Sequence, residues 1–215
     1  MIQLEQVTFT YDKTTILDHT DFIFKDGNLY VIIVQNNKQK QALLTLFSNQ
    51  QLLDTGNITY KEKMYCQQEI GIPDMTIQEN LTVLSLGKLD TNYDSLLSLM
   101  ELEKNKRVKD LTADEKQKLA IISTNIQEAN NKIFHSLEVL AIQRRKIYFQ
   151  EFLQKQVSDG QTILVITEQY REIISFIDAL CFLQQKQIVC LRTSMRYDLG
   201  YFDYKKGKIR HARND

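Results

Sequence analysis

Lys40 stands where a lysine can bind a phosphate group. Residues 29–34 form an uninterrupted apolar run, three polar residues follow, and residues 38–48 carry apolar side chains at helical spacing. This order is typical of a buried strand, a short loop and a helix. The positive end of a helix attracts anions, and the ammonium group of Lys40 adds charge of the same sign. Lys40 and this helix start could therefore offer positive charge to a phosphate group.

A glutamate follows each of two further segments that have a strand pattern. Glu138 comes directly after residues 132–137, and Glu168 comes directly after residues 162–167. The Glu138 carboxylate is a candidate catalytic group. A solvated glutamate in the first turn of a helix has the same sequence pattern, because that position suits negative charge. The sequence leaves both interpretations open for Glu138.

Cysteine usage and composition exclude several classes of site. Cys66, Cys181 and Cys190 lack the spacing of metal ligands, so we expect three free thiols in a reducing compartment and no metal site. The 27 basic and 27 acidic side chains cancel, which does not indicate nucleic-acid binding. No apolar run approaches the roughly 20 residues of a membrane span, and the first residues do not resemble a signal peptide. We therefore expect a cytoplasmic protein.

The framework that must position these residues has the pattern of a single α/β domain over residues 1–215. Apolar alternation and buried runs predict strands at residues 2–9, 16–24, 29–34, 132–137, 162–167, 179–183 and 187–191. Helical spacing predicts helices at residues 38–48, 77–86, 93–100, 113–128, 138–156 and 169–176. This order predicts a mainly parallel sheet with an N-terminal antiparallel β portion and a helical subdomain at about residues 74–125. The basic tail, residues 201–215, is interpreted as a solvated segment or a small hairpin.

Several of these segments occur in the order and spacing of the nucleotide-binding subunits of ABC transporters. Tyr11 stands where that family has an aromatic residue that stacks on adenine, although a tyrosine at a strand end gives the same pattern. Gln68 matches the family's Q-loop glutamine, and residues 76–81 (TIQENL) follow it as they do in the family. From residue 2 to residue 191 the chain resembles these subunits. The resemblance implies a P-loop NTPase fold and candidate ATP contacts at Tyr11 and Gln68.

The phosphate-loop segment departs from the family pattern, G-x-x-G-x-G-K-[ST]. Residues 34–41 (VQNNKQKQ) contain no glycine, and Gln41 replaces the hydroxyl group that binds Mg²⁺. Glycine permits the positive φ angles that turn backbone N–H groups toward phosphate, and the β-branched Val34 resists them. We therefore expect at most weak ATP binding and poor Mg²⁺ binding. The resemblance assigns four residues of this segment to ATP: Asn36, Asn37, Lys40 and Gln41.

Three further motif positions have changed. The family signature, L-S-G-G-Q, becomes LTADE at residues 111–115, which places carboxylates where the family contacts phosphate. Leu137 stands at the Walker B aspartate position, and Glu168 replaces the switch histidine. Glu138 aligns with the family's catalytic glutamate but lacks that aspartate. Since losing one preorganised contact typically costs about 10²-fold in rate, we expect at most residual catalysis.

The resemblance also implies partners and a location. It predicts a structural or regulatory pseudo-ATPase at the inner face of the cell membrane, with a permease helix docked near residues 68–81. It further predicts a homodimer, or a heterodimer with another ATP-binding subunit, and no nucleic acid. Two alternatives stay open. One is an ATP-binding subunit that drives transport by weak ATP hydrolysis through Tyr11, Lys40 and Gln68; the other is a stand-alone cytosolic regulatory module.

Overall fold

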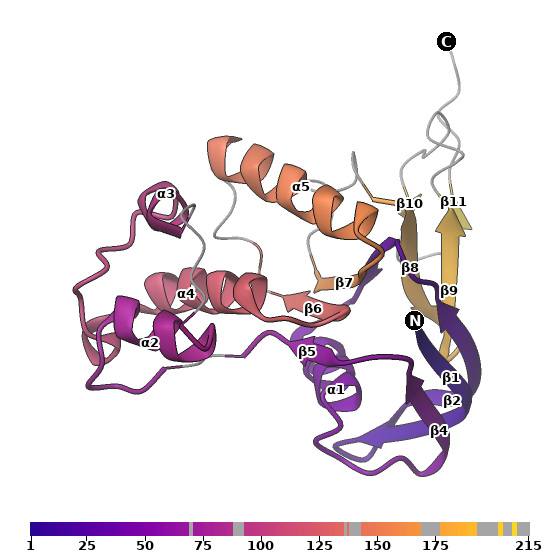
Figure 1. Cartoon of the computed structure of the whole chain (residues 1–215). Coiled ribbons are helices and arrows are strands. Elements are labelled where there is room, and N and C mark those ends of the chain that lie inside the picture. The colour runs from indigo at the N-terminus through magenta and orange to yellow at the C-terminus, as the bar shows by residue number, and fades with distance from the viewer. Residues whose placement is uncertain are drawn as a thin grey trace.

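Figure 1 shows the computed structural model of the chain. It describes residues 1–68, 71–87, 93–135, 137, 143–168, 177–192, 202–203 and 208–209. The predicted helix at residues 169–176, most of the basic tail and Glu138 lie outside these ranges. In the described part of the chain, no helix is both long enough and apolar enough to span a membrane.

An antiparallel sheet at the N-terminal side has the strand order β2-β1-β4. Its strands are β1 (Ile2–Tyr11), β2 (Thr14–Phe24) and β4 (Thr55–Tyr60). Strand β1 buries Ile2, Leu4, Val7 and Phe9, and a register shift between Leu4 and Val7, where Gln6 has a positive φ, interrupts the predicted alternation by one residue. This sheet is the N-terminal antiparallel β portion that the sequence predicts.

The main sheet has the strand order β5-β6-β7-β3-β8-β9. Its strands are β3 (Leu29–Ile33), β5 (Met64–Cys66), β6 (Asn131–His135), β7 (Thr162–Thr167), β8 (Ala179–Gln184) and β9 (Gln187–Arg192). All neighbours are parallel except β9, which runs antiparallel to β8. Both β3 and β7 are buried along their whole length, as expected for central parallel strands covered on two faces. The predicted mainly parallel sheet is confirmed.

Helices cover the two faces of this sheet (Figure 1). On one face α1 (Asn37–Phe47) packs Ala42, Leu43 and Leu46 into the same apolar core as β1. On the other face lie α4 (Ala113–Ile126) and α5 (Gln143–Ser158), whose Leu119 and Phe149 belong to a second core. Because successive strand residues point to opposite faces, Val31 of β3 enters the second core and Ile32 enters the first.

The short helices α2 (Ile77–Leu84) and α3 (Tyr93–Leu99) lie with α4 on the side away from the antiparallel sheet (Figure 1). A single 3₁₀ turn, Val108–Asp110, leads into α4. These helices fall in the region predicted as a helical subdomain, and the division into subdomains stays a prediction. At the C-terminal side, β10 (Phe202–Asp203) pairs antiparallel with β11 (Lys208–Ile209), as a small hairpin would.

The cysteine expectation is wrong for two of the three thiols. Cys181 of β8 lies directly opposite Cys190 of β9, with 4.0 Å between their Cα atoms, and the two form a disulfide. The turn between the strands consists of Gln185 and Lys186, both at positive φ, as in a two-residue hairpin turn. The turn sets the register of β8 and β9 and thereby places the two cysteines opposite each other. Their spacing in the sequence alone does not show this pairing. Cys66 is free and buried, and burial raises the pKa of its thiol to about 12.

Candidate functional site

The carboxyl ends of the central strands bring the predicted motif segments to one edge of the sheet. Ile33 at the end of β3 pairs with Thr167 at the end of β7, and the Val34 N–H donates to the Thr167 carbonyl over 3.0 Å. Glu168 follows directly. The end of β6 lies on the other side of β7, since His135 pairs with Ile166. The edge therefore holds the phosphate-loop segment and the switch position side by side.

The phosphate-loop segment begins a capped helix in place of an open loop. Asn36 is the N-cap of α1, with extended backbone, and its side-chain oxygen accepts from the Gln39 N–H over 2.9 Å. The Lys40 N–H donates to the Asn36 carbonyl over 3.2 Å. The aligned glycine positions at Asn37 and Gln39 are therefore helical, and no residue from 34 to 41 has a positive φ. The sequence needs no glycine here because the backbone avoids the glycine conformation.

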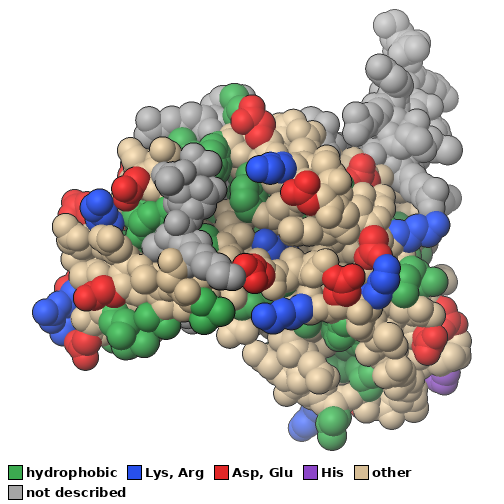
Figure 2. Space-filling model, in the orientation of Figure 1, with side chains coloured by type: hydrophobic (Ala, Val, Ile, Leu, Met, Phe, Trp, Pro, Cys, Tyr) green, Lys and Arg blue, Asp and Glu red, His purple; other side chains and the backbone are tan. Residues whose placement is uncertain are grey.

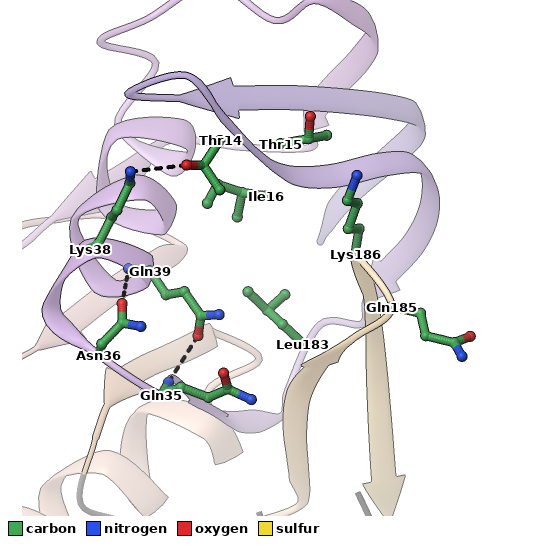
Figure 3. Close-up of a pocket in the computed structure, with 10 residues that line it drawn as sticks. All are labelled: Thr14, Thr15, Ile16, Gln35, Asn36, Lys38, Gln39, Leu183, Gln185 and Lys186. Carbon is green, nitrogen blue, oxygen red and sulfur yellow. Dashed lines mark hydrogen bonds between the residues drawn. The ribbon is translucent and has the colours of Figure 1, made fainter. Parts of the chain in front are cut away.

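A side chain of the same segment satisfies a third backbone donor. The Gln39 side-chain oxygen accepts from the Gln35 N–H over 2.9 Å (Figure 3). A phosphate-binding loop presents its backbone N–H groups to an anion. In this chain the N–H groups of Gln35, Gln39 and Lys40 already have protein acceptors.

Lys40 has an internal partner at the switch position. Its Nζ lies 3.3 Å from Oε1 of Glu168, and the Lys40 side chain is only 14% exposed. The Glu168 side chain is 38% exposed and lies at the surface end of the pair. The carboxylate supplies the negative charge that a phosphate would otherwise bring to this lysine.

Lys38 is held by the turn between β1 and β2. Its Nζ donates to Thr14 Oγ1 over 2.9 Å and lies 2.9 Å from a carboxylate oxygen of Asp12 (Figure 3 shows the Thr14 contact). Asp12 and Lys13 adopt positive φ in that turn. Tyr11, just before it, is partly buried and packs against the core shared by β1 and α1. This packing suits the interpretation of Tyr11 as a strand-end tyrosine.

A cavity of about 300 Å³ lies beside the segment (Figure 3). It is lined by the start of β2, the segment that leads into α1 with the first turn of α1, and the hairpin of β8 and β9. Neither Tyr11 nor Lys40 is among the described residues that line it, which are Thr14, Thr15, Ile16, Gln35, Asn36, Lys38, Gln39, Leu183, Gln185 and Lys186. Its wall is mixed: amides, hydroxyls and two lysines line it together with the apolar side chains of Ile16 and Leu183.

The sequence predicts Gln68 as the Q-loop glutamine, but the glutamine that is buried at the end of β5 is its neighbour, Gln67. Gln68 is exposed, whereas Gln67 is 3% exposed. The Gln67 side-chain oxygen accepts from the His135 backbone N–H over 2.9 Å. The Gln67 backbone N–H donates to the Ile133 carbonyl over 2.8 Å. Gln67 thus joins the ends of β5 and β6. Two successive glutamines carry the same sequence signal, and only the pairing of these strands distinguishes them.

Residues of the predicted signature cap α4. The Glu115 N–H donates to Thr112 Oγ1 over 3.3 Å, and the Thr112 N–H donates to the Glu115 carboxylate over 2.8 Å. The ammonium of Lys106 lies 2.8 Å from both carboxylate oxygens. The Lys106 hydrogen bonds, followed by the backbone N–H of Thr112, lower the pKa of Glu115. Glu115 therefore has a structural role at the start of the helix.

Thr112→Ala is expected to lower the free energy of unfolding by about 1 kcal/mol, because the α4 cap is lost. Urea unfolding followed by circular dichroism measures the change. Thr82→Ala is the matched control: Thr82 is exposed in α2 and donates only to the Gln78 carbonyl one turn earlier. Alanine favours a helix interior, so the control should be as stable as the native chain or more so. Equal stability of all three proteins would contradict a capping role for Thr112.

No protein-family model matches the chain. An uncharacterized ABC transporter ATP-binding protein of Bacillus subtilis (strain 168) is 24% identical over 197 residues, covering 83% of this chain and 90% of that protein. A putative ABC transporter ATP-binding protein of onion yellows phytoplasma (strain OY-M) is 22% identical over 222 residues. That match covers 91% of this chain but 38% of the phytoplasma protein.

Solved structures show the same architecture. An ATP-binding subunit of an ABC transporter matches with a TM-score of 0.76 at 15% identity, covering 91% of this chain and 92% of that one. A dimeric bacterial ABC transporter cassette matches with a TM-score of 0.71 at 18% identity, covering 89% and 98%. CbiO1 from Clostridium perfringens matches with a TM-score of 0.68 at 15% identity, covering 91% and 90%. The predicted P-loop NTPase fold is confirmed: the chain has the fold of an ABC ATP-binding cassette, and it resembles ABC transporter ATP-binding proteins in sequence.

Proposed function

We propose that this chain is an ABC-type nucleotide-binding subunit that acts as a structural or regulatory pseudo-ATPase. The observation that carries the proposal is the ion pair between Lys40 and Glu168, 3.3 Å apart. A phosphate that binds Lys40 would have to displace the Glu168 carboxylate from it, or else bind beside that carboxylate and be repelled by it. Both effects disfavour a polyphosphate ligand.

The residues assigned to ATP do not fit Mg-ATP well. The N–H groups of Gln35, Gln39 and Lys40 already have acceptors within the chain. Gln41 is exposed and offers a neutral amide where Mg²⁺ prefers a hydroxyl or a carboxylate. We therefore assign no hydrolytic step to this chain, and the role of Glu138 stays a prediction.

The proposed partner is a membrane permease, docked against the segment before α2 and α2 itself. Ile72 before α2, Val83 in α2 and Leu86 just after it are 48%, 54% and 85% exposed. Figure 2 shows hydrophobic side chains over this part of the molecule. Exposed apolar residues near one another are typical of interaction surfaces. The CbiO1 neighbour is part of an ABC transporter complex, which supports a permease partner by analogy.

A second ATP-binding subunit is the other proposed partner, either another copy of this chain or an intact ATPase. One structural neighbour is a dimeric cassette, which supports the pairing by analogy. If the partner is an intact ATPase, its own phosphate loop supplies the chemistry. Copurification with a membrane protein supports this arrangement, and a chain that stays free of membranes in the same cells supports the stand-alone regulatory module.

Equilibrium binding of ATP tests the proposal directly. We expect no saturable binding at millimolar ATP, with or without Mg²⁺, measured by titration calorimetry. Lys40→Ala should give the same flat titration, since Lys40 is already neutralised by Glu168. Micromolar binding that disappears in Lys40→Ala would overturn the proposal. It would favour instead the weakly hydrolysing transporter subunit, for which the retained lysine at the start of α1 is the supporting observation.

A further inference from the structure

The disulfide between β8 and β9 sits in a hairpin that joins the two sheets. Cys181 is fully buried, and Cys190 is partly buried against the same core. β9 is the edge strand of the main sheet, and β8 is its only neighbour in that sheet among the described strands. A bond from Cys190 to Cys181 therefore fixes an edge strand to the sheet interior.

The turn of this hairpin holds β2. The Lys186 carbonyl accepts from the Asp18 N–H over 3.0 Å and from Thr20 Oγ1 over 3.1 Å. Gln185 and Lys186 also line the cavity beside the phosphate-loop segment (Figure 3). If β9 separated from β8, the turn could move. This movement would weaken the Lys186 hydrogen bonds to β2 and displace the part of the cavity lining that Gln185 and Lys186 form.

We propose that the Cys181–Cys190 disulfide forms and breaks reversibly, and that its redox state determines how firmly the Gln185–Lys186 turn is held against β2 at the edge of the cavity. When it is formed, the turn stays against β2 and bounds the cavity on that side. When it is reduced, β9 loosens from β8, the Lys186 contacts with β2 weaken, and the cavity widens on that side. The proposal is independent of nucleotide binding, because it concerns the hairpin alone.

The chemistry is thiol–disulfide exchange with a low-molecular-weight disulfide. The more exposed thiol, Cys190, attacks as its thiolate and forms a mixed disulfide, which releases one small thiol. The Cys181 thiolate then attacks the Cys190 sulfur and releases the second small thiol. Two protein thiols are oxidised, one small disulfide is reduced, and the two protein protons go to the departing thiolates. Reduction by a small dithiol reverses both steps.

The test uses the full chain equilibrated with oxidised glutathione or with dithiothreitol. After alkylation in denaturant, mass spectrometry should find one modified cysteine, Cys66, in the oxidised sample and all three in the reduced one. Reduction should lower the Tm by about 5–10 °C, since a short closed loop is released. It should also accelerate amide exchange in β9 and at Asp18 by about tenfold or more.

Cys190→Ala is the control, because it cannot form the bond, and Cys66→Ala is the matched variant that keeps it. Cys66→Ala should respond to dithiothreitol as the native chain does, whereas Cys190→Ala should not respond. Three alkylated cysteines after equilibration with oxidised glutathione would overturn the proposal. So would exchange at Asp18 that is the same in the oxidised and reduced chain.

Discussion

Glu168→Gln should bring ATP binding into the measurable range, with a Kd about 10- to 100-fold below the millimolar limit at which the native chain shows no saturation, a difference of about 1.4–2.8 kcal/mol. The change removes the carboxylate that lies 3.3 Å from the Lys40 ammonium. It frees this cation for a phosphate and removes a negative charge that would repel it. A partly exposed ion pair contributes at most about 1 kcal/mol to stability, so the variant should stay folded. Titration calorimetry with ATP and with inorganic triphosphate measures the gain.

Two controls make this result specific. Glu103→Gln makes the same charge change at an exposed position in the loop after α3, and it should leave binding unchanged. The double variant Glu168→Gln with Lys40→Ala should lose the gain, because the freed cation is absent. A gain that survives the loss of Lys40 would show that Glu168 acts by a route other than this ion pair.

Lys132→Met should raise the free energy of unfolding at pH 7 by about 1–3 kcal/mol. Lys132 of β6 is 3% exposed, and its ammonium donates to the Asn125 carbonyl near the end of α4 over 3.0 Å. Burial lowers the pKa of Lys132 from 10.5 to about 8. The folded chain must therefore hold a buried charge below that pH. Methionine fills a similar volume without the charge, although it leaves the Asn125 carbonyl without this donor.

The pH dependence gives the sign of the effect. Between pH 8 and 10.5 the unfolded chain holds the Lys132 proton more tightly than the folded chain does. The Lys132 contribution to stability therefore rises with pH across this window and is lowest below it. The advantage of Lys132→Met should shrink as pH rises, as measured by urea unfolding from pH 7 to 10. Lys63→Met, at an exposed position, should show no such trend, and a constant advantage for Lys132→Met would contradict the assignment.

The fold could be predicted because its strongest signals are local. Residues 29–34 and 162–167 are apolar throughout, and the structure buries β3 and β7 at these positions. The helix predicted at residues 38–48 is α1, one residue earlier at each end. Burial of one or both faces of an element leaves a periodic pattern of apolar residues. This pattern can be recognised from neighbouring positions in the sequence alone.

The contacts of the site could not be predicted, because they depend on register between distant segments. The sequence around Lys40 does not indicate that Glu168, which follows another strand, lies with its Oε1 3.3 Å from the Lys40 Nζ. Gln67 and Gln68 differ only in which of them meets β6. Cys181 and Cys190 become neighbours through a turn of Gln185 and Lys186, and these residue types lack the Asn-Gly signal of a two-residue turn.

The capped start of α1 has a consequence for any soluble ligand of this edge. The acceptors that meet the N–H groups of Gln35 and Gln39 are side chains of the same segment. Such tethered groups compete at an effective concentration set by the fold, and dilution or purification never lowers it. A diffusing nucleotide would therefore face a permanent intramolecular competitor. Because this competitor is constant, it raises the apparent Kd of the nucleotide by a fixed factor, and a higher ATP concentration is needed for the same occupancy of this edge.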